Sequence, residues 1–168
     1  MIAIHQTCQR LYYYKFNKVS CTSYELSINI GNVIYLDCSD NYNGYINLKT
    51  LNLTKLVCND YFTDSDIIHL PNLTFLNIRD SHITDKAIRT LTKLTYLNCG
   101  YAYNSKITDI SLCKLSNLTQ LNCGDHPSDN MTLSNLINLS HLNCGFACFS
   151  DNSIKGLKLT HLNCEMCS

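Results

Sequence analysis

The C-terminal half of the chain repeats one short pattern of apolar and polar residues. Leu94–Cys99 reads Leu-Thr-Tyr-Leu-Asn-Cys, and similar phrases start at Leu118, Leu139 and Leu159, at intervals of 24, 21 and 20 residues. Positions 1, 4 and 6 of each phrase are apolar, whereas positions 3 and 5 are mostly polar or aromatic. Because positions 4 and 6 are two residues apart, they share one face of a strand. The pattern therefore predicts a short strand in every copy.

Less regular phrases begin earlier, at Val33, Leu53 and Leu73. In the last of these, Ile78 stands where the others have Cys, so this position requires a modest apolar side chain and not a thiol. Between the phrases, segments such as Thr84–Leu91 begin with Thr-Asp and place apolar residues three apart, which is typical of a short capped helix. A single strand cannot bury its own apolar face, but stacked copies cover one another.

The repeated phrase resembles the leucine-rich-repeat family, whose consensus is L-x-x-L-x-L-x-x-(N/C)-x-L. The resemblance covers residues 33–168 and implies an α/β fold. This fold is a curved leucine-rich-repeat solenoid of about seven repeats, with parallel strands on the concave face and short helices or turns on the convex face. The chain departs from the consensus at the third Leu, which is usually Cys here, and at the Asn/Cys turn position, kept only by Asn41 and Cys167 with Ser81 as a substitute. The Ile-Thr-Asp segments are similar to the cysteine-containing and internalin-like subtypes.

Residues 1–32 do not follow the repeat, and we expect them to form an N-terminal cap of one short helix and one strand. Apolar residues between Ile4 and Phe16 lie at helical spacing, and Tyr24–Ile30 alternates apolar and polar residues as a strand does. Cys8–Asn17 is similar to the last helix of an F-box, which often precedes leucine-rich repeats. The segment is thus a cap, an F-box remnant or a degenerate first repeat, ahead of a repeat domain over residues 33–168.

Charge and hydropathy exclude several classes of function. The formal net charge is zero and only 15% of residues are charged, so no basic stripe indicates nucleic-acid binding. No apolar run approaches the ~18 residues of a membrane span. The first residues lack the apolar segment of a signal peptide. Abundant Asn, Ile, Lys and Tyr resemble proteins of AT-rich genomes, such as those of giant viruses and amoebae.

The 11 cysteines suggest a secreted disulfide scaffold at first sight, but their positions argue otherwise. Six of them occupy phrase position 6, which we expect to be buried, namely Cys38, Cys58, Cys99, Cys123, Cys144 and Cys164. Four of the five Asn-x-Ser/Thr sequons lie where a helical segment turns into the next strand, a poor place for a glycan. We therefore expect an intracellular protein with reduced thiols, in the cytoplasm, or in the host-cell cytoplasm if the protein is viral.

Phrase positions 3, 5 and 7 point away from the predicted core and form three columns on the concave face. We predict that these columns bind a partner. The candidate residues are Tyr35, Lys55, Phe75, Tyr96, Gln120, His141 and His161 at position 3, Asn77, Asn98, Asn122 and Asn143 at position 5, and Arg79 at position 7. Aromatic residues in a row favour a contact surface, although ring packing between strands explains them equally well. The amides in register can instead stabilise the sheet by bonding to one another along the stack.

The sequence predicts no catalytic, metal or cofactor site. Cys144, Cys148, Cys164 and Cys167 have spacings that occur in zinc sites, but the first and third should point inward, away from the histidines. Cys148 and Cys167 fall one position apart in consecutive repeats and can pair instead. Buried thiols lack the exposed, electropositive setting of a nucleophile, and no phosphate-binding loop is present.

We conclude from the sequence that the protein is not an enzyme but a module that binds another protein through its concave face. Two alternatives stay open: the substrate-recognition part of an F-box-type receptor, whose partner is the adaptor of a cullin ubiquitin ligase, and a degenerate paralogue without a selected partner. We also expect the last strand to lack a cap, as in a truncated chain, a dimer contact or a degenerate copy. No nucleic-acid or membrane partner is expected.

Overall fold

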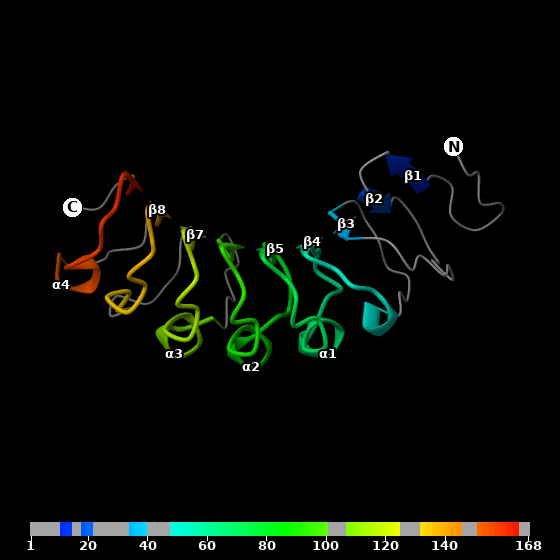
Figure 1. Cartoon of the computed structure of the whole chain (residues 1–168), viewed down its shortest axis with the longest axis horizontal. Helices are drawn as coiled ribbons and strands as arrows, with labels where there is room; N and C mark the ends of the chain where they lie inside the picture. Colours follow the sequence, from blue (N-terminus) through cyan, green and yellow to red (C-terminus); the bar gives the residue numbers. More distant parts are fainter. Residues whose placement is uncertain are drawn as a thin grey trace.

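The computed structural model describes residues 11–14, 18–21, 34–39, 48–100, 107–124, 132–145 and 151–164. These residues form one open sheet whose nine strands are hydrogen-bonded in sequence order (Figure 1). The strands are β1 (Leu11–Tyr14), β2 (Lys18–Cys21), β3 (Tyr35–Asp37), β4 (Lys55–Val57), β5 (Phe75–Asn77), β6 (Tyr96–Asn98), β7 (Gln120–Asn122), β8 (His141–Asn143) and β9 (His161–Asn163). Strands β3 to β9 are the seven predicted repeat strands.

Each repeat strand consists of phrase positions 3, 4 and 5, and each runs parallel to its neighbours. The central leucines lie opposite one another, as Leu76 does with Leu97 and Leu97 with Leu121. The phrase therefore aligns without a register shift, although its copies are spaced unequally along the chain. The prediction of an α/β leucine-rich-repeat solenoid with parallel strands is confirmed.

Short helices return the chain from one strand to the next on the opposite side of the sheet. They are η1 (Leu48–Thr50), α1 (Asp64–Ile67), α2 (Asp85–Ile88), α3 (Asp109–Leu112) and α4 (Asp151–Ile154). Of the two candidate caps in the Thr-Asp pair, Thr84 is the N-cap residue of α2, and its hydroxyl accepts a hydrogen bond from the Lys86 amide. Figure 1 shows the strands along the inner side of a gentle arc and the helices along the outer side.

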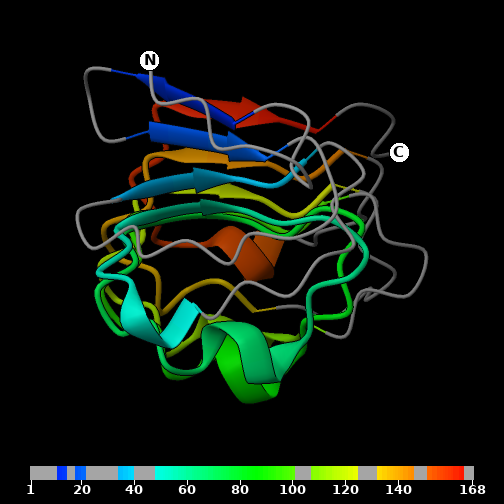
Figure 2. The ribbon, with the colours of Figure 1, turned by 90° about the vertical axis from the view of Figure 1, so that its right-hand side faces the viewer.

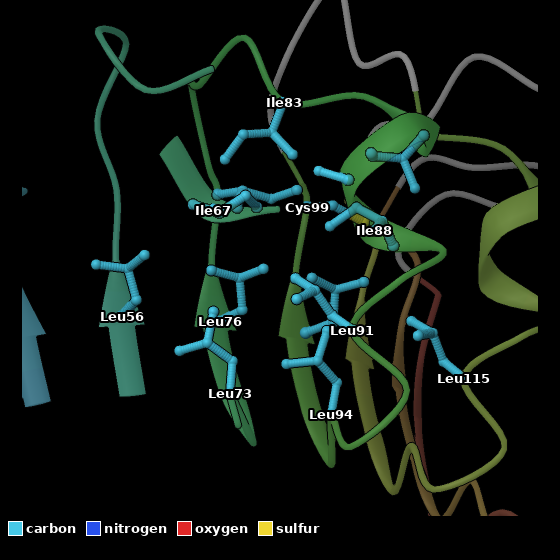
Figure 3. Packing of buried hydrophobic residues seen from close by; sticks show 14 of the residues in the cluster. Leu56, Ile67, Leu73, Leu76, Ile83, Ile88, Leu91, Leu94, Cys99 and Leu115 are labelled. Carbon is cyan, nitrogen blue, oxygen red and sulfur yellow. The ribbon is translucent and has the colours of Figure 1, made fainter. Parts of the chain in front are cut away.

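The core is one continuous apolar layer between the strands and the helices (Figure 2). The sheet contributes Leu76 and Leu97, and the helices contribute Ile67 and Ile88, all fully buried. Figure 3 shows Leu76, Ile67 and Ile88 in this cluster, together with turn leucines such as Leu91. A fully buried aliphatic side chain contributes about 1.5–3 kcal/mol relative to an exposed one, so the stacked repeats stabilise one another mainly through this layer.

A ladder of hydroxyl groups at phrase position 2 fixes the register of the stack. The Thr74 carbonyl accepts three hydrogen bonds from the next repeat, from the amides of Thr95 and Tyr96 at 2.8 and 3.1 Å and from the Thr95 hydroxyl at 3.0 Å. The same three bonds recur in each repeat from Ile34 to Thr160. The side chain at this position thus supports the main-chain ladder. Valine in its place would lose one bond per repeat.

A second set of contacts joins the helices of neighbouring repeats, which we call the Asp–Thr clasps. The Asp64 carboxylate accepts hydrogen bonds from the Thr84 amide (2.8 Å) and hydroxyl (2.7 Å). Asp85 does the same for Thr108, at 2.7 and 2.6 Å. Since hydrogen bonds to charged acceptors are roughly twice as strong as neutral ones, each clasp supports the convex side of its repeat.

The N-terminal segment differs from the prediction. Leu11–Tyr14 is the strand β1 and not part of a helix, and it pairs antiparallel with β2, which in turn runs parallel to β3. The run Leu-Tyr-Tyr-Tyr has strong strand propensity, which outweighed the helical spacing of the apolar residues in its surroundings. The predicted strand over Tyr24–Ile30 lies outside the described residues.

Five of the six cysteines at phrase position 6 are buried, as predicted, whereas Cys164 is exposed. Burial raises the pKa of the Cys99 thiol from 9.0 to about 12 and that of Cys123 well above its usual value. These thiols therefore remain protonated and serve as packing groups. Among the described residues, no helix combines the length and apolar composition needed to cross a membrane.

Candidate interaction surface on the concave face

The concave face is formed by the side chains that flank the buried leucine of each strand. At phrase position 3, Lys55, Gln120 and His161 are exposed, and the other four residues of the column are half-buried. At position 5, the predicted asparagines are half-buried, whereas Val57 is only 9% exposed. All 12 predicted surface residues thus lie on the strands or directly after them.

Two pairs of rings stack between adjacent strands of this face. The ring centroids of Phe75 and Tyr96 are 4.2 Å apart with an interplanar angle of 5°, and those of His141 and His161 are 4.1 Å apart at 9°. Ring packing between strands, one of the two interpretations left open by the sequence, therefore occurs. Stacking covers one face of each of these rings. Partial burial raises the pKa of Tyr96, so its hydroxyl stays neutral.

The asparagines at phrase position 5 bond to their own loops and not to one another. The Asn98 side-chain oxygen accepts from the Gly100 amide at 3.2 Å, and Asn122 and Asn143 make the same bond to Gly124 and Gly145. Asn77 bonds the Arg79 amide in this way. The expected ladder of amide-to-amide bonds is therefore wrong within the described ranges. The local bond is preferred because the oxygen reaches a main-chain donor two residues ahead.

This arrangement leaves a row of hydrogen-bond donors on the concave face. With each side-chain oxygen turned toward its loop, the Nδ2 group of Asn98, Asn122 and Asn143 has no protein acceptor in the part of the chain that the structure describes. A partner that covers these donors must supply acceptors, because an unmatched buried polar group costs about 1–3 kcal/mol.

The C-terminal half of the face is hollowed into an open groove of about 550 Å³ across β6 to β9. Its lining includes Tyr96, Gln120, Asn122, Asn143 and the two histidines. Gly100 itself lies close to the next repeat, since a Cβ atom there would lie 2.9 Å from the Asn122 side-chain oxygen. The sequence analysis did not predict a groove, because its depth depends on how the side chains fill the face.

Charge divides the concave face into two halves. The strands β3 to β5 carry Asp37, Lys55 and, directly after β5, Arg79. From β6 to β9, the described residues at positions 3, 5 and 7 include no Lys, Arg, Asp or Glu. The groove therefore offers neutral hydrogen-bonding groups and ring edges, and it is suited to a partner surface that is polar but not strongly charged.

Both histidines in the groove are oriented by the hydroxyl residue that precedes them. His141 Nδ1 lies 2.8 Å from Ser140 Oγ, and His161 Nδ1 lies 3.0 Å from Thr160 Oγ1. Sequence reasoning identified the histidines but missed these two residues. The available signal was the Ser-His and Thr-His pair inside the repeated phrase, where the hydroxyl position adjoins the surface column.

The described residues show no other cluster that would suggest chemistry. Within those ranges, no three His, Cys, Asp or Glu side chains approach closely enough to hold a metal ion together. Of the cysteines considered for zinc, Cys144 is buried and Cys164 is exposed, while Cys148 and Cys167 lie outside the described residues. The loop at Asp125–Asp129 also lies outside them.

Solved structures with the same fold are found among bacterial internalins. An internalin (InlF) from Listeria monocytogenes matches with a TM-score of 0.58 and 24% identity, over 81% of this chain and 48% of its own. Internalin C2 from the same organism matches with a TM-score of 0.58 and 18% identity, over 87% of this chain and 79% of its own. The chain thus spans about half the length of InlF. No protein-family model and no curated protein sequence matches the chain. The similarity is one of fold: an internalin-like leucine-rich-repeat solenoid.

Proposed function

We propose that the protein is a non-catalytic module that binds another protein through its concave face, with the groove across β6 to β9 as the centre of the contact. The observation that carries the proposal is the groove itself. Its amide donors have no acceptor among the described residues, and its rings lie on a stack of hydrogen-bonded strands. A rigid scaffold that presents adaptable polar groups is a common basis of recognition.

The composition of the groove favours a protein partner over a small charged ligand. Aromatic residues are enriched at protein interfaces, and charged residues are depleted at their centres. Tyr96 and the stacked histidines provide the aromatic component, and the groove between β6 and β9 lacks described charged residues at its three surface columns. The charged residues near β3 to β5 would then lie at the rim, where they affect the association rate more than the affinity.

We further propose that the protein acts inside a cell with its thiols reduced. The sequon asparagines Asn72, Asn117 and Asn138 use their Nδ2 groups in hydrogen bonds that link neighbouring repeats. A glycan on Nδ2 would replace one of its two protons and place a bulky group beside the neighbouring repeat that accepts the bond. Buried thiols spread over five repeats also suit a reducing compartment, because no partner thiol is needed.

A photo-crosslinking experiment tests the proposed surface. A photoreactive amino acid is placed at Gln120 in the groove in one variant and at Ile110, which is 67% exposed on helix α3, in a matched control. We expect the Gln120 probe to capture a defined protein from the source cells and the Ile110 probe to capture none of it. Addition of Asn122→Lys, which introduces a charge into the lining of the groove, should abolish the capture.

Two controls keep the result interpretable. Circular dichroism and thermal melting show whether each variant is folded, since Gln120 and Ile110 are both exposed and should tolerate replacement. Capture that is equal from the two faces, or that persists with Asn122→Lys, would show that the concave groove is not the binding surface.

The alternative as a receptor for a cullin ubiquitin ligase is less favoured. It rests on the similarity of Cys8–Asn17 to an F-box helix, and Leu11–Tyr14 within that segment is a strand. An F-box adaptor would therefore have to bind a different conformation. Direct measurement of binding between the chain and a purified adaptor of this class distinguishes the two proposals, and we expect no binding.

A further inference from the structure

Strand β9 leaves one edge of the sheet open. It lies at the end of the strand order (Figure 1), and among the described residues it pairs only with β8. The His161 amide donates to the Ser140 carbonyl at 3.0 Å, and the Asn163 carbonyl accepts from the Cys144 amide at 2.9 Å. These two residues of β9 therefore face β8. Since successive residues of a strand face opposite neighbours, the amide and the carbonyl of Leu162 face away from the sheet.

Two more main-chain groups face the same way, as comparison with the preceding repeat shows. The Ser140 carbonyl accepts three hydrogen bonds from the next repeat, and the Cys144 amide donates one to it. The equivalent groups of the last strand are the Thr160 carbonyl and the Cys164 amide. Within the described residues, none of the four outward groups has a hydrogen-bond partner. Such an edge is a template for pairing with a further strand.

The apolar side chains behind this edge are also incompletely covered. Leu162 is 46% exposed, whereas the six leucines at the same phrase position are at most 2% exposed. Cys164 is exposed, although the other five cysteines at its position are buried. Ile154, Leu157 and Leu159 of the same repeat are only partly buried. The edge thus requires an occupant that supplies both a strand and apolar side chains on the core side of that strand.

The order of the outward groups makes the edge complementary to itself. Along β9 it is acceptor, donor, acceptor and donor: the Thr160 carbonyl, the Leu162 amide and carbonyl, and the Cys164 amide. A two-fold axis perpendicular to the sheet, midway between two Leu162 residues, reverses this order in the second copy. The two Leu162 residues then exchange both hydrogen bonds, and each Cys164 amide faces the Thr160 carbonyl of the other copy. The same axis keeps both concave faces on one side, so the exposed leucines meet on the core side.

We propose that two copies of the chain pair antiparallel through β9, in a two-fold dimer that joins their sheets and their apolar layers. Closed two-fold symmetry is the commonest form of oligomer. It covers both β9 edges at once, whereas pairing of β9 with β1 of another copy would leave one edge open at each end. The formal net charge of zero gives little long-range repulsion between copies. The dimer places two concave faces side by side, and it does not depend on the proposed partner.

The oligomeric state in solution is the first test. The contact comprises one short strand and one repeat from each copy, so we expect a dimer that forms in the micromolar range and dissociates on dilution. Sedimentation velocity of the full chain over this range should show the mass of two chains at the upper end. In the same series, the reactivity of Cys164 toward a thiol reagent should fall as the protein concentration rises.

Matched variants locate the contact. Leu162→Lys places two like charges opposite each other at the axis, and we expect it to weaken dimerisation at least about 100-fold. Ile110→Lys introduces the same charge at a residue that is 67% exposed on helix α3, and it should leave dimerisation unchanged. Cys164→Pro removes an outward amide and keeps every bond to β8, so it should weaken dimerisation about 10-fold. Circular dichroism shows whether each variant is folded.

Disulfide trapping tests the register. In the proposed dimer, His161 lies opposite Asn163 of the other copy as a non-hydrogen-bonded pair, with Cα atoms about 4.5 Å apart, which a disulfide can span. We therefore expect a mixture of His161→Cys and Asn163→Cys copies, both carrying Cys164→Ser, to form a disulfide between these two positions on mild oxidation. Neither variant alone should form one at its own position, because those residues are diagonal neighbours about 7–8 Å apart. Mass spectrometry of the linked peptides identifies the positions.

Three results would overturn the proposal. A folded chain that stays monomeric across the whole concentration range would show that another occupant, such as a further repeat, covers this edge. Equal dimerisation of folded Leu162→Lys and Ile110→Lys would place the contact elsewhere on the molecule. Disulfides that form as readily in either single variant as in the mixture would exclude the two-fold register at Leu162.

Discussion

The Asp–Thr clasps offer a sharp test of how the repeats are joined, because the chain provides its own control. Asp85 is the first residue of α2 and binds both the amide and the hydroxyl of Thr108 in the next repeat. Asp109 is the first residue of α3 and also follows an N-cap Thr, but its carboxylate has no hydrogen-bond partner in the described part of the chain. Alanine at each position removes the same charge from the same place in a four-residue helix.

The expected difference follows from the two hydrogen bonds. A hydrogen bond to a charged acceptor contributes about 1.5–3 kcal/mol net, and screening at the half-buried Asp85 reduces the sum. We therefore expect Asp85→Ala to lower the free energy of unfolding by about 2 kcal/mol more than Asp109→Ala does. Loss of the charge at the helix N-terminus, about 0.3–1 kcal/mol, is common to both variants and cancels. Asp85→Asn, which keeps one acceptor, should lie between them.

Thermal and urea unfolding provide the measurement. A difference of about 2 kcal/mol corresponds to roughly 4–8 °C in Tm for a domain of this size. Hydrogen exchange adds a local readout: the Thr108 amide should lose protection in Asp85→Ala and keep it in Asp109→Ala. Equal destabilisation by the two alanine variants would refute the view that these contacts hold adjacent repeats together.

Three further predictions concern the core and its thiols. Leu97→Ala should lower the free energy of unfolding by about 2–5 kcal/mol in chemical denaturation, whereas Leu162→Ala, at a side chain that is 46% exposed, should cost about 1 kcal/mol or less; similar losses would contradict the buried layer. In the native protein, a thiol reagent should modify Cys164 rapidly and Cys99 only after denaturation, as mass spectrometry of the labelled peptides will show. Stability measured from pH 9 to 12 should decrease, because the pKa of Cys99 is raised from 9.0 to about 12 and its thiol ionises first in the unfolded chain; constant stability over this range would argue against a buried thiol.

The repeat architecture could be predicted from the sequence because one geometric rule recurs seven times. A leucine at phrase position 4 and a small apolar residue at position 6 must share a face, and only a stack of parallel strands buries all copies together. Leu36, Leu56 and Leu76 are completely buried for this reason. The helix that caps at Thr84 was predictable from the same kind of local rule.

The N-terminal strand was not predictable in the same way. Leu11–Tyr14 has no repeat to fix its period, so helical spacing of scattered apolar residues competed with the strand propensity of three consecutive tyrosines. Pairing with β2 stabilises the strand conformation, and this contact cannot be predicted from the residues of the segment alone.

The surface columns were predicted, but their chemistry was not. Alternation places Asn98 and Asn122 on the concave face, yet it does not say whether an amide bonds along the stack or back to its own loop. The glycine two residues ahead settles this, since its amide lies within reach at 3.2 Å for Asn98 and 3.1 Å for Asn122. Each histidine likewise has a hydroxyl beside its Nδ1 atom, from Ser140 or Thr160, and the sequence analysis gave these two residues no role.

The hydroxyl ladder at phrase position 2 has a consequence for how such a chain tolerates change in length. Because three donors bind each of these carbonyls, the alignment of neighbouring repeats is fixed at this position, and the rest of the repeat can vary in length. The bond between Thr74 and Thr95 spans 21 residues, and that between Thr95 and Thr119 spans 24. Whole repeats are therefore interchangeable units. In a chain in which Leu73 is joined directly to Thr95, the Thr95 hydroxyl would take the place of the Thr74 hydroxyl at the Thr54 carbonyl. The solenoid would then be one repeat shorter, with a continuous apolar core.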